Sequence, residues 1–67
     1  MNDVVILDGL DAAVIEQRGS RLVYSEEKII DILMERDGMT REEAIEFIDY
    51  NIVGLVDGMR NGPIIED

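Results

Sequence analysis

Three carboxylates in the second half of the chain have a spacing that can support binding. Glu42, Glu46 and Asp49 fall at positions i, i+4 and i+7 of a predicted helix, so they lie along one side of it. Such a row can bind a cation or an arginine-rich surface. The simpler interpretation is a solvated helix face, because the residues opposite an apolar stripe must be polar in any case. Acid/base catalysis would require burial that raises one carboxyl pKa, and nothing in the sequence indicates such burial.

A calcium-binding loop is the second chemistry to consider, because the segment MERDGMTREEA contains an Asp-Gly pair. When Gly38 is aligned with the required glycine of that loop, Leu33 falls at the first ligand position and Ala44 at the twelfth. Those positions need an Asp and a bidentate Glu, so calcium binding is not expected. The chain also has no Cys and no His, which removes the commonest zinc ligands and the commonest general base. We therefore expect no metal site, no cofactor and no enzymatic activity.

A strand followed by two helices, RLVYSEEKIIDILMERDGMTREEAIEFIDYN, resembles the ribbon-helix-helix pattern of small dimeric DNA-binding repressors. In that family the strand carries the side chains that read the bases. Arg18 and Arg21 lie on or near the strand and are the candidate DNA-binding residues. Four glutamates at the helix starts weigh against this alternative, since they would crowd the positions where phosphates dock.

The elements that position these residues begin with extended segments. The apolar, β-branched run Val4–Leu7 predicts a short strand or an ordered arm. Two further extended segments, Ala12–Gln17 and Arg21–Ser25, are separated by Arg18-Gly19-Ser20 and predict a β-hairpin, because the glycine can adopt a positive φ.

The first predicted helix begins after Ser25 and runs to about Arg36. Ser25 is a suitable N-cap, and the glutamates that follow it are favoured by the helix dipole. The apolar residues of this segment recur at helical spacing and predict a face that packs on the core. Gly38 is expected to end the helix in the left-handed C-cap conformation.

The second predicted helix begins at Thr40, which forms a capping box with Glu43. Gly54 is expected to end it near Val53. Beyond it, Leu55-Val56 and Pro63-Ile64-Ile65 flank residues 57–62, a segment interpreted as a second hairpin or as a loop before the last strand. We therefore predict one α+β domain over residues 1–67, with a small antiparallel sheet of two to four short strands packed against a helical hairpin, in the approximate order β-β-β-α-α-β.

The overall charge limits the kind of partner. Six basic and sixteen acidic residues give a net charge of −10, which repels nucleic-acid phosphates and anionic membranes. A basic protein partner is favoured. The absence of Cys fits a reducing cytoplasm, and neither a signal peptide nor an apolar segment of membrane-spanning length is recognisable. Since 46% of so short a chain is hydrophobic, a homodimer is expected to cover the remaining apolar surface.

Several blocks of the chain together resemble a known group of sequences. The blocks LDGLDAAVI, LVYSEEKIIDILMERDGMTREEAIEFIDYNIVG and GPIIE, in this order, are similar to a widespread group of short open reading frames of unknown function in phages and in bacterial and archaeal genomes. The most specific part is the segment Met34–Gly54. The resemblance implies a prokaryotic or viral origin and an α+β fold, and it implies no activity. Glu16-Gln17 departs from the pattern, because a glycine often follows the first strand in the group.

Two classes of function remain from these observations. The leading hypothesis is a non-enzymatic interaction module, a phage-encoded inhibitor or modulator of a host nucleic-acid-handling or defence protein in the cytoplasm of a bacterial or infected host cell. Its expected interface is Glu42, Glu46 and Asp49, with Tyr50 as an aromatic neighbour. The alternatives are a dimeric ribbon-helix-helix regulator that binds DNA and an oligomer that binds a small ligand such as a nucleotide.

Overall fold

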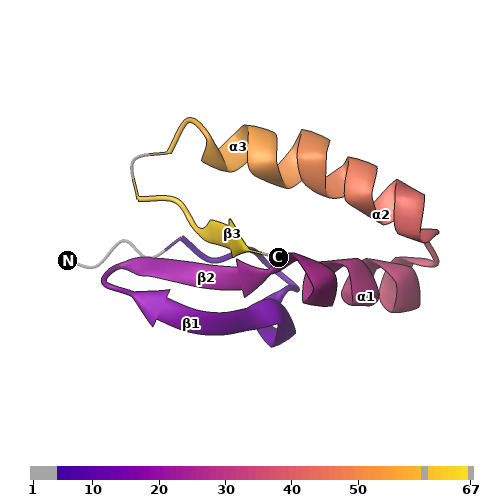
Figure 1. The fold of residues 1–67 in the computed structure, drawn as a ribbon, viewed down its shortest axis with the longest axis horizontal. Helices are drawn as coiled ribbons and strands as arrows, with labels where there is room; N and C mark the ends of the chain where they lie inside the picture. The colour runs from indigo at the N-terminus through magenta and orange to yellow at the C-terminus, as the bar shows by residue number, and fades with distance from the viewer. Residues whose placement is uncertain (1–4, 60, 67) are drawn as a thin grey trace.

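The computed structural model of the protein describes residues 5–59 and 61–66 and shows a small α+β fold (Figure 1). The elements in chain order are a 3-10 turn η1 (Asp11–Ala13), strands β1 (Val14–Arg18) and β2 (Arg21–Ser25), helices α1 (Glu26–Asp37) and α2 (Arg41–Phe47), a π-helical stretch η2 (Ile48–Val53), helix α3 (Gly54–Val56) and strand β3 (Ile64–Glu66). Elements α2, η2 and α3 follow one another without a break, and we call residues 41–56 the long helix. None of the helices in the described part of the chain is long and apolar enough to cross a membrane.

The predicted hairpin is confirmed. Strands β1 and β2 pair in antiparallel orientation, with Arg18 opposite Arg21, so the connection is a two-residue turn. Gly19 in this turn has φ +60°, a conformation that costs glycine little. The first strand begins later than expected, because residues 11–13 form the 3-10 turn, and a bulge interrupts its register between Val14 and Glu16.

The third strand makes the sheet mixed. The strand order is β1-β2-β3, and β3 pairs with β2 in parallel orientation, with Val23 opposite Ile64 and Tyr24 opposite Ile65. The expectation of a purely antiparallel sheet was therefore wrong. The physical reason is the connection, since α1 and the long helix stand between β2 and β3 and carry the chain back to the end of the sheet where β2 began (Figure 1).

The segment before the hairpin is an arm. Val4 lies outside the described residues, and residues 5–7 form no strand. The arm is attached to the fold through Leu7, whose backbone N–H donates to the Tyr24 hydroxyl oxygen at 2.9 Å. Of the two conformations expected for this segment, residues 5–7 therefore adopt the arm, and the described elements follow the order β-β-α-α-β.

The predicted caps around α1 and α2 are confirmed. The Ser25 hydroxyl accepts from the Lys28 backbone N–H at 3.3 Å, and Gly38 ends α1 with φ +68°. In the capping box, the Thr40 hydroxyl accepts from the Glu43 N–H at 3.1 Å, while the Glu43 carboxylate accepts from the Thr40 N–H at 2.9 Å. These local bonds reverse the chain between the helices and fix where the long helix begins.

The long helix does not end near Val53 as expected. Gly54 has φ −60° and ψ −37°, which is ordinary right-handed helix, and the helix continues to Val56. The wider turns of η2 carry the hydrogen bonding through this point, because the Gly54 N–H donates to the Asp49 carbonyl five residues earlier. The left-handed conformation that ends a helix at a glycine is therefore not adopted here, and the expectation of an extended segment at residues 55–56 was also wrong.

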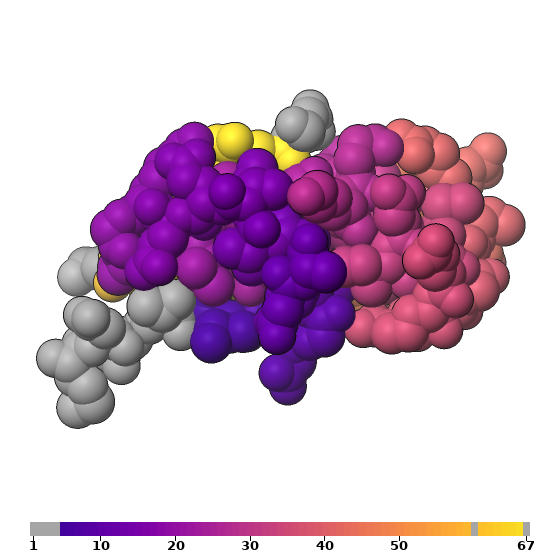
Figure 2. Space-filling model, turned by 90° about the horizontal axis from the view of Figure 1, so that it is seen from below, coloured from indigo at the N-terminus to yellow at the C-terminus, as the bar shows by residue number. Residues whose placement is uncertain are grey.

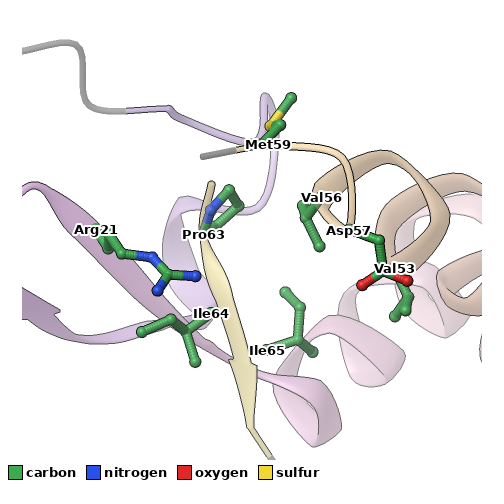
Figure 3. Close-up of a pocket in the computed structure, with 8 residues that line it drawn as sticks. All are labelled: Arg21, Val53, Val56, Asp57, Met59, Pro63, Ile64 and Ile65. Atoms are coloured by element: carbon green, nitrogen blue, oxygen red, sulfur yellow. The ribbon is translucent and has the colours of Figure 1, made fainter. Parts of the chain in front are cut away.

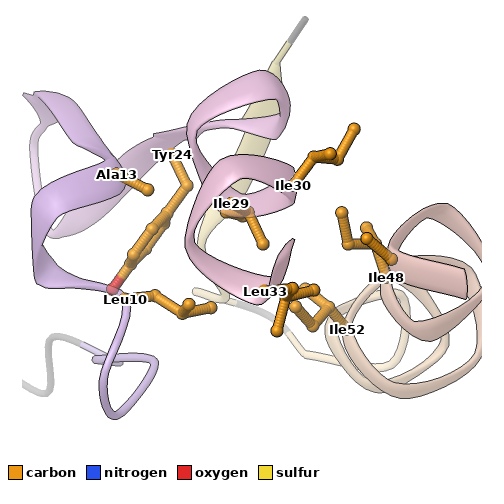
Figure 4. Packing of buried hydrophobic residues seen from close by; sticks show 9 residues of the cluster. Leu10, Ala13, Tyr24, Ile29, Ile30, Leu33, Ile48 and Ile52 are labelled. Carbon is orange, nitrogen blue, oxygen red and sulfur yellow. The ribbon is translucent and has the colours of Figure 1, made fainter. Parts of the chain in front are cut away.

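One hydrophobic core joins the sheet, α1 and the long helix (Figure 4). Its members come from the arm, η1, β2 and both helices, so no element has a separate core. They are Leu10, Ala13, Tyr24, Ile29, Ile30, Leu33, Ala44, Ile48 and Ile52. Each is at most 5% exposed. The long helix therefore packs on the core through one side, which carries Ala44, Ile48 and Ile52.

Gly38, with a positive φ, and Gly54, with a helical φ, provide a test of the continuous long helix. We expect Gly38→Ala to lower the free energy of unfolding by about 1 kcal/mol, because its positive φ strains any L side chain, while the site itself has open space. We expect Gly54→Ala to raise it by about 0.5–1 kcal/mol, since the backbone is already helical and the new Cβ makes ordinary contact at 3.7 Å with the Asp49 carbonyl oxygen.

The measurement is urea unfolding of both variants followed by far-ultraviolet circular dichroism. A loss of stability in Gly54→Ala as large as that in Gly38→Ala would contradict the continuous long helix.

Candidate functional site: the acidic face of the long helix

The long helix separates its core residues from its carboxylates. Glu42, Glu46 and Asp49 are exposed on the side away from the core, as the helical spacing predicts. Tyr50 follows them and is 81% exposed. We call these four residues the acidic face. The arm, β1 and α1 make up most of the surface seen from below in Figure 2, away from the long helix.

The carboxylates of the acidic face form an open row. Glu42 and Glu46 are one helical turn apart, which corresponds to roughly 6 Å along the helix axis. In the described part of the chain, none of the three carboxylates has an ion pair or a side-chain hydrogen bond. None of residues 5–59 and 61–66 therefore neutralises their negative charge.

Apolar groups accompany this row. Ile45, between Glu42 and Glu46 in sequence, is 37% exposed, and the Tyr50 ring is almost fully in solvent. An aromatic ring beside charged groups is the composition that anchors many protein interfaces, because the ring buries a large area while the charges select the partner. The acidic face thus has the groups for a small protein contact.

The cation nearest in sequence to the acidic face is already paired. Arg41, at the first position of α2, donates to both carboxylate oxygens of Glu27 on α1, at 3.2 and 2.6 Å. These hydrogen bonds hold the pKa of Glu27 below its ordinary value, with the charge of Arg41 as a further cause. The ion pair links the two helices and leaves the row of carboxylates acidic.

The two arginines proposed for DNA binding are brought together at the hairpin turn, and Arg18 is paired with carboxylates. Arg18 forms ion pairs with Glu16 and Glu66, each at 2.9 Å, and Arg21 donates from Nε to the Gly62 carbonyl at 2.8 Å. The hydrogen bond and charge of Arg18 lower the pKa of Glu16. Moreover, β2 has a neighbouring strand on each side, so the strand before α1 has no free edge for a second copy of the chain. This geometry weighs against the ribbon-helix-helix alternative.

The calcium-like segment forms the end of α1, the Gly38 turn and the start of α2. Its Asp37 accepts two bonds from Arg36, at 3.2 and 3.0 Å, which lowers the pKa of Asp37. Among residues 5–59 and 61–66, no three acidic side chains are grouped in a way that would hold a metal ion.

One feature of the surface was missed by sequence reasoning. A pocket lies at the C-terminal end of the long helix, where Val53 and Val56 face strand β3 (Figure 3). It was missed because Gly54 was interpreted as the helix end. The signal that could have revealed it is the spacing of these two valines, which is that of neighbouring turns of a continuing helix.

Comparison of this chain with protein-family models, with curated proteins and with solved structures found no match. The interpretation of the site therefore rests on its own residues.

The Glu27–Arg41 pair gives a titration test of the geometry beside the acidic face. We expect Arg41→Gln to raise the pKa of Glu27 toward its ordinary value, because the hydrogen bonds and the charge that stabilise the carboxylate are removed. Since the folded-state pKa is lowered, the pair contributes stability above the unfolded-state pKa, and this contribution is lost as pH falls through the folded-state pKa. The variant should therefore show less loss of stability in that acid range.

The pKa of Glu27 is measured from the carboxyl carbon chemical shifts in an NMR pH titration of the wild type and of Arg41→Gln. The control is Arg36→Gln, which should raise the pKa of Asp37 and leave that of Glu27 unchanged. A Glu27 pKa that is the same with and without Arg41 would show that the pair does not form in solution.

Proposed function

We propose that the protein is a non-enzymatic interaction module that binds a basic protein through the acidic face. The observation that carries this proposal is the row formed by Glu42, Glu46 and Asp49, whose charges have no partner in the described part of the chain. The nearby cation Arg41 is occupied by Glu27. A surface of this kind binds most favourably to a partner that supplies arginine or lysine side chains.

The net charge supports the same proposal. A charge of −10 on 67 residues creates a long-range field that attracts basic surfaces and repels polyanions. Complementary charge mainly raises the association rate and selects the partner, while buried apolar groups contribute more of the affinity. Ile45 and Tyr50, both exposed, supply such groups.

The partner class follows from the chemistry and from the resemblance to short phage and prokaryotic reading frames. A basic groove that holds nucleic acid offers closely spaced cations, which a row of carboxylates can occupy in place of phosphates. We therefore propose a phage-encoded inhibitor or modulator of a host nucleic-acid-handling or defence protein, acting in the cytoplasm. No observation favours a nucleotide-binding role.

A homodimer remains part of the proposal. Exposed large apolar side chains outside the acidic face include Ile6, Ile15 and Leu55, at 60%, 47% and 54% exposure. Sedimentation at increasing protein concentration measures the oligomeric state, and a monomer throughout would remove this part without affecting the acidic face.

Affinity capture with matched variants tests the proposed interface. The tagged protein is used to capture partners from a nuclease-treated bacterial lysate, in parallel with Glu42→Gln/Glu46→Gln and with Asp31→Asn/Glu35→Gln. Both variants remove two negative charges, but the second pair lies exposed on α1. We expect one basic protein to be retained by the wild type and by the α1 variant, and to be retained at least about tenfold less by the acidic-face variant.

Salt dependence is the second readout of this experiment. Raising the salt from about 0.1 to about 1 M shortens the Debye length from roughly 10 to 3 Å, and the captured protein should be released. If the acidic-face variant and the α1 variant retain the partner equally poorly, only the net charge of the protein matters. If the partner stays bound at high salt, the contact is not electrostatic. Either result contradicts the proposal.

A further inference from the structure

A pocket of about 380 Å³ lies between the end of the long helix and strand β3 (Figure 3). This volume falls within the range of small-molecule sites, roughly 300–1,000 Å³. Six of its eight lining residues have apolar side chains, namely Val53, Val56, Met59, Pro63, Ile64 and Ile65. Two charged residues, Arg21 and Asp57, complete the lining.

The state of Arg21 differs from that of the other arginines described. Arg18, Arg36 and Arg41 each form an ion pair, whereas Arg21 forms none with any residue that the structure describes. Its Nε donates to the Gly62 carbonyl at 2.8 Å, and the N–H groups of the two Nη atoms have no protein acceptor within the same residues. A guanidinium whose coplanar donors are not taken up by the described residues is suited to bind a carboxylate.

The loop before β3 holds this guanidinium in position. Gly62 packs so closely on the end of the long helix that an added Cβ would lie 2.9 Å from the Met59 Cβ and 3.4 Å from the Val56 carbonyl oxygen. Only glycine fits there without a shift of the loop. The Gly62 carbonyl accepts the Nε–H of Arg21, so part of the side-chain freedom of Arg21 is already lost before a ligand binds.

The second charge of the pocket has the opposite sign. Asp57 follows the last turn of the long helix and lies across the pocket from Arg21, with the side chains of β3 between them (Figure 3). Its carboxylate forms no ion pair or side-chain hydrogen bond with the described residues. The pocket thus presents a cation on one side and an anion on the other, with residues of apolar type between them.

We propose that this pocket binds a small zwitterion of dipeptide size with apolar side chains. Its carboxylate accepts hydrogen bonds from Arg21, its ammonium group faces Asp57, and its side chains contact the apolar wall that includes Val53 and Val56. A simple anion would be repelled by Asp57 and by the net charge of −10, and a simple cation would leave Arg21 unused. A ligand with separated charges of opposite sign and apolar side chains complements both charged residues and the apolar residues of the lining.

The test is a titration of isotope-labelled protein with leucyl-leucine, followed by two-dimensional NMR of the backbone amides. We expect saturable shifts at the residues of the pocket and none at the acidic face. Leucyl-leucine amide, which lacks the carboxylate, and N-acetyl-leucyl-leucine, which lacks the ammonium group, should each bind at least about tenfold more weakly.

Variants test the two charged residues separately. Arg21→Gln and Asp57→Asn should each weaken leucyl-leucine binding by about tenfold or more, whereas the charge-matched controls Lys28→Gln and Asp31→Asn on α1 should not. Amide shifts outside the pocket report whether a variant keeps its fold. The two blocked ligands test the same two charge contacts on the wild-type protein, where folding is not in question.

The absence of shifts at millimolar leucyl-leucine would overturn the proposal, as would equal binding of the free and blocked ligands. Because the pocket and the acidic face share no residue, Glu42→Gln/Glu46→Gln should bind leucyl-leucine like the wild type. A failure of leucyl-leucine to bind the pocket can therefore be distinguished from a failure of the acidic face to bind a protein partner.

Discussion

The burial of Tyr24 is the interaction on which the rest of the fold depends. This residue lies in the central strand, is fully buried and packs between Leu10 and Ala13 on one side and α1 on the other (Figure 4). Its hydroxyl oxygen also accepts the Leu7 N–H and attaches the arm. Loss of that hydroxyl would leave a partly buried N–H unpaired, at a cost of about 1–3 kcal/mol, which is a large share of the stability of so short a chain.

The small size of this core determines what the surface can do. A chain of 67 residues buries only about 60% of its unfolded surface, so the long helix has one apolar side and no second core on which to pack its other side. The carboxylates of the acidic face must therefore point outward. Because the capping box and the Gly38 turn fix where the helix begins, these carboxylates are presented on a rigid element. The backbone of the row is therefore ordered before a partner binds, and only the side chains lose conformational freedom on binding.

Features set by neighbouring residues were predictable from the sequence. The caps at Ser25 and Thr40, the Gly38 turn and the hairpin turn at Gly19 all depend on local backbone preferences, and each was found. The exposure of Glu42, Glu46 and Asp49 also follows from helical spacing alone.

Features set by distant residues were not predictable in this way. The parallel pairing of β3 depends on which strand it reaches after two helices, and the bond from Arg21 to Gly62 spans 41 positions. Gly54 is compatible with a helix interior and with a helix end, and in the structure its N–H continues the hydrogen bonding of the π-helical turns that precede it. The Asn51 side chain in those turns donates to the Phe47 carbonyl at 3.2 Å, a bond to the backbone four residues earlier that no pattern of apolar residues reveals.

The central claim, that the acidic face is the surface used for binding, is tested most directly by zero-length carboxyl-to-amine crosslinking in a bacterial lysate, with the crosslinked residues identified by mass spectrometry. The chain has sixteen acidic residues, so chance contact would distribute crosslinks over all exposed carboxylates. We expect crosslinks to lysines of one basic protein, concentrated at Glu42, Glu46 and Asp49. Crosslinks spread evenly over the acidic residues, or concentrated on α1 or the hairpin, would contradict the account.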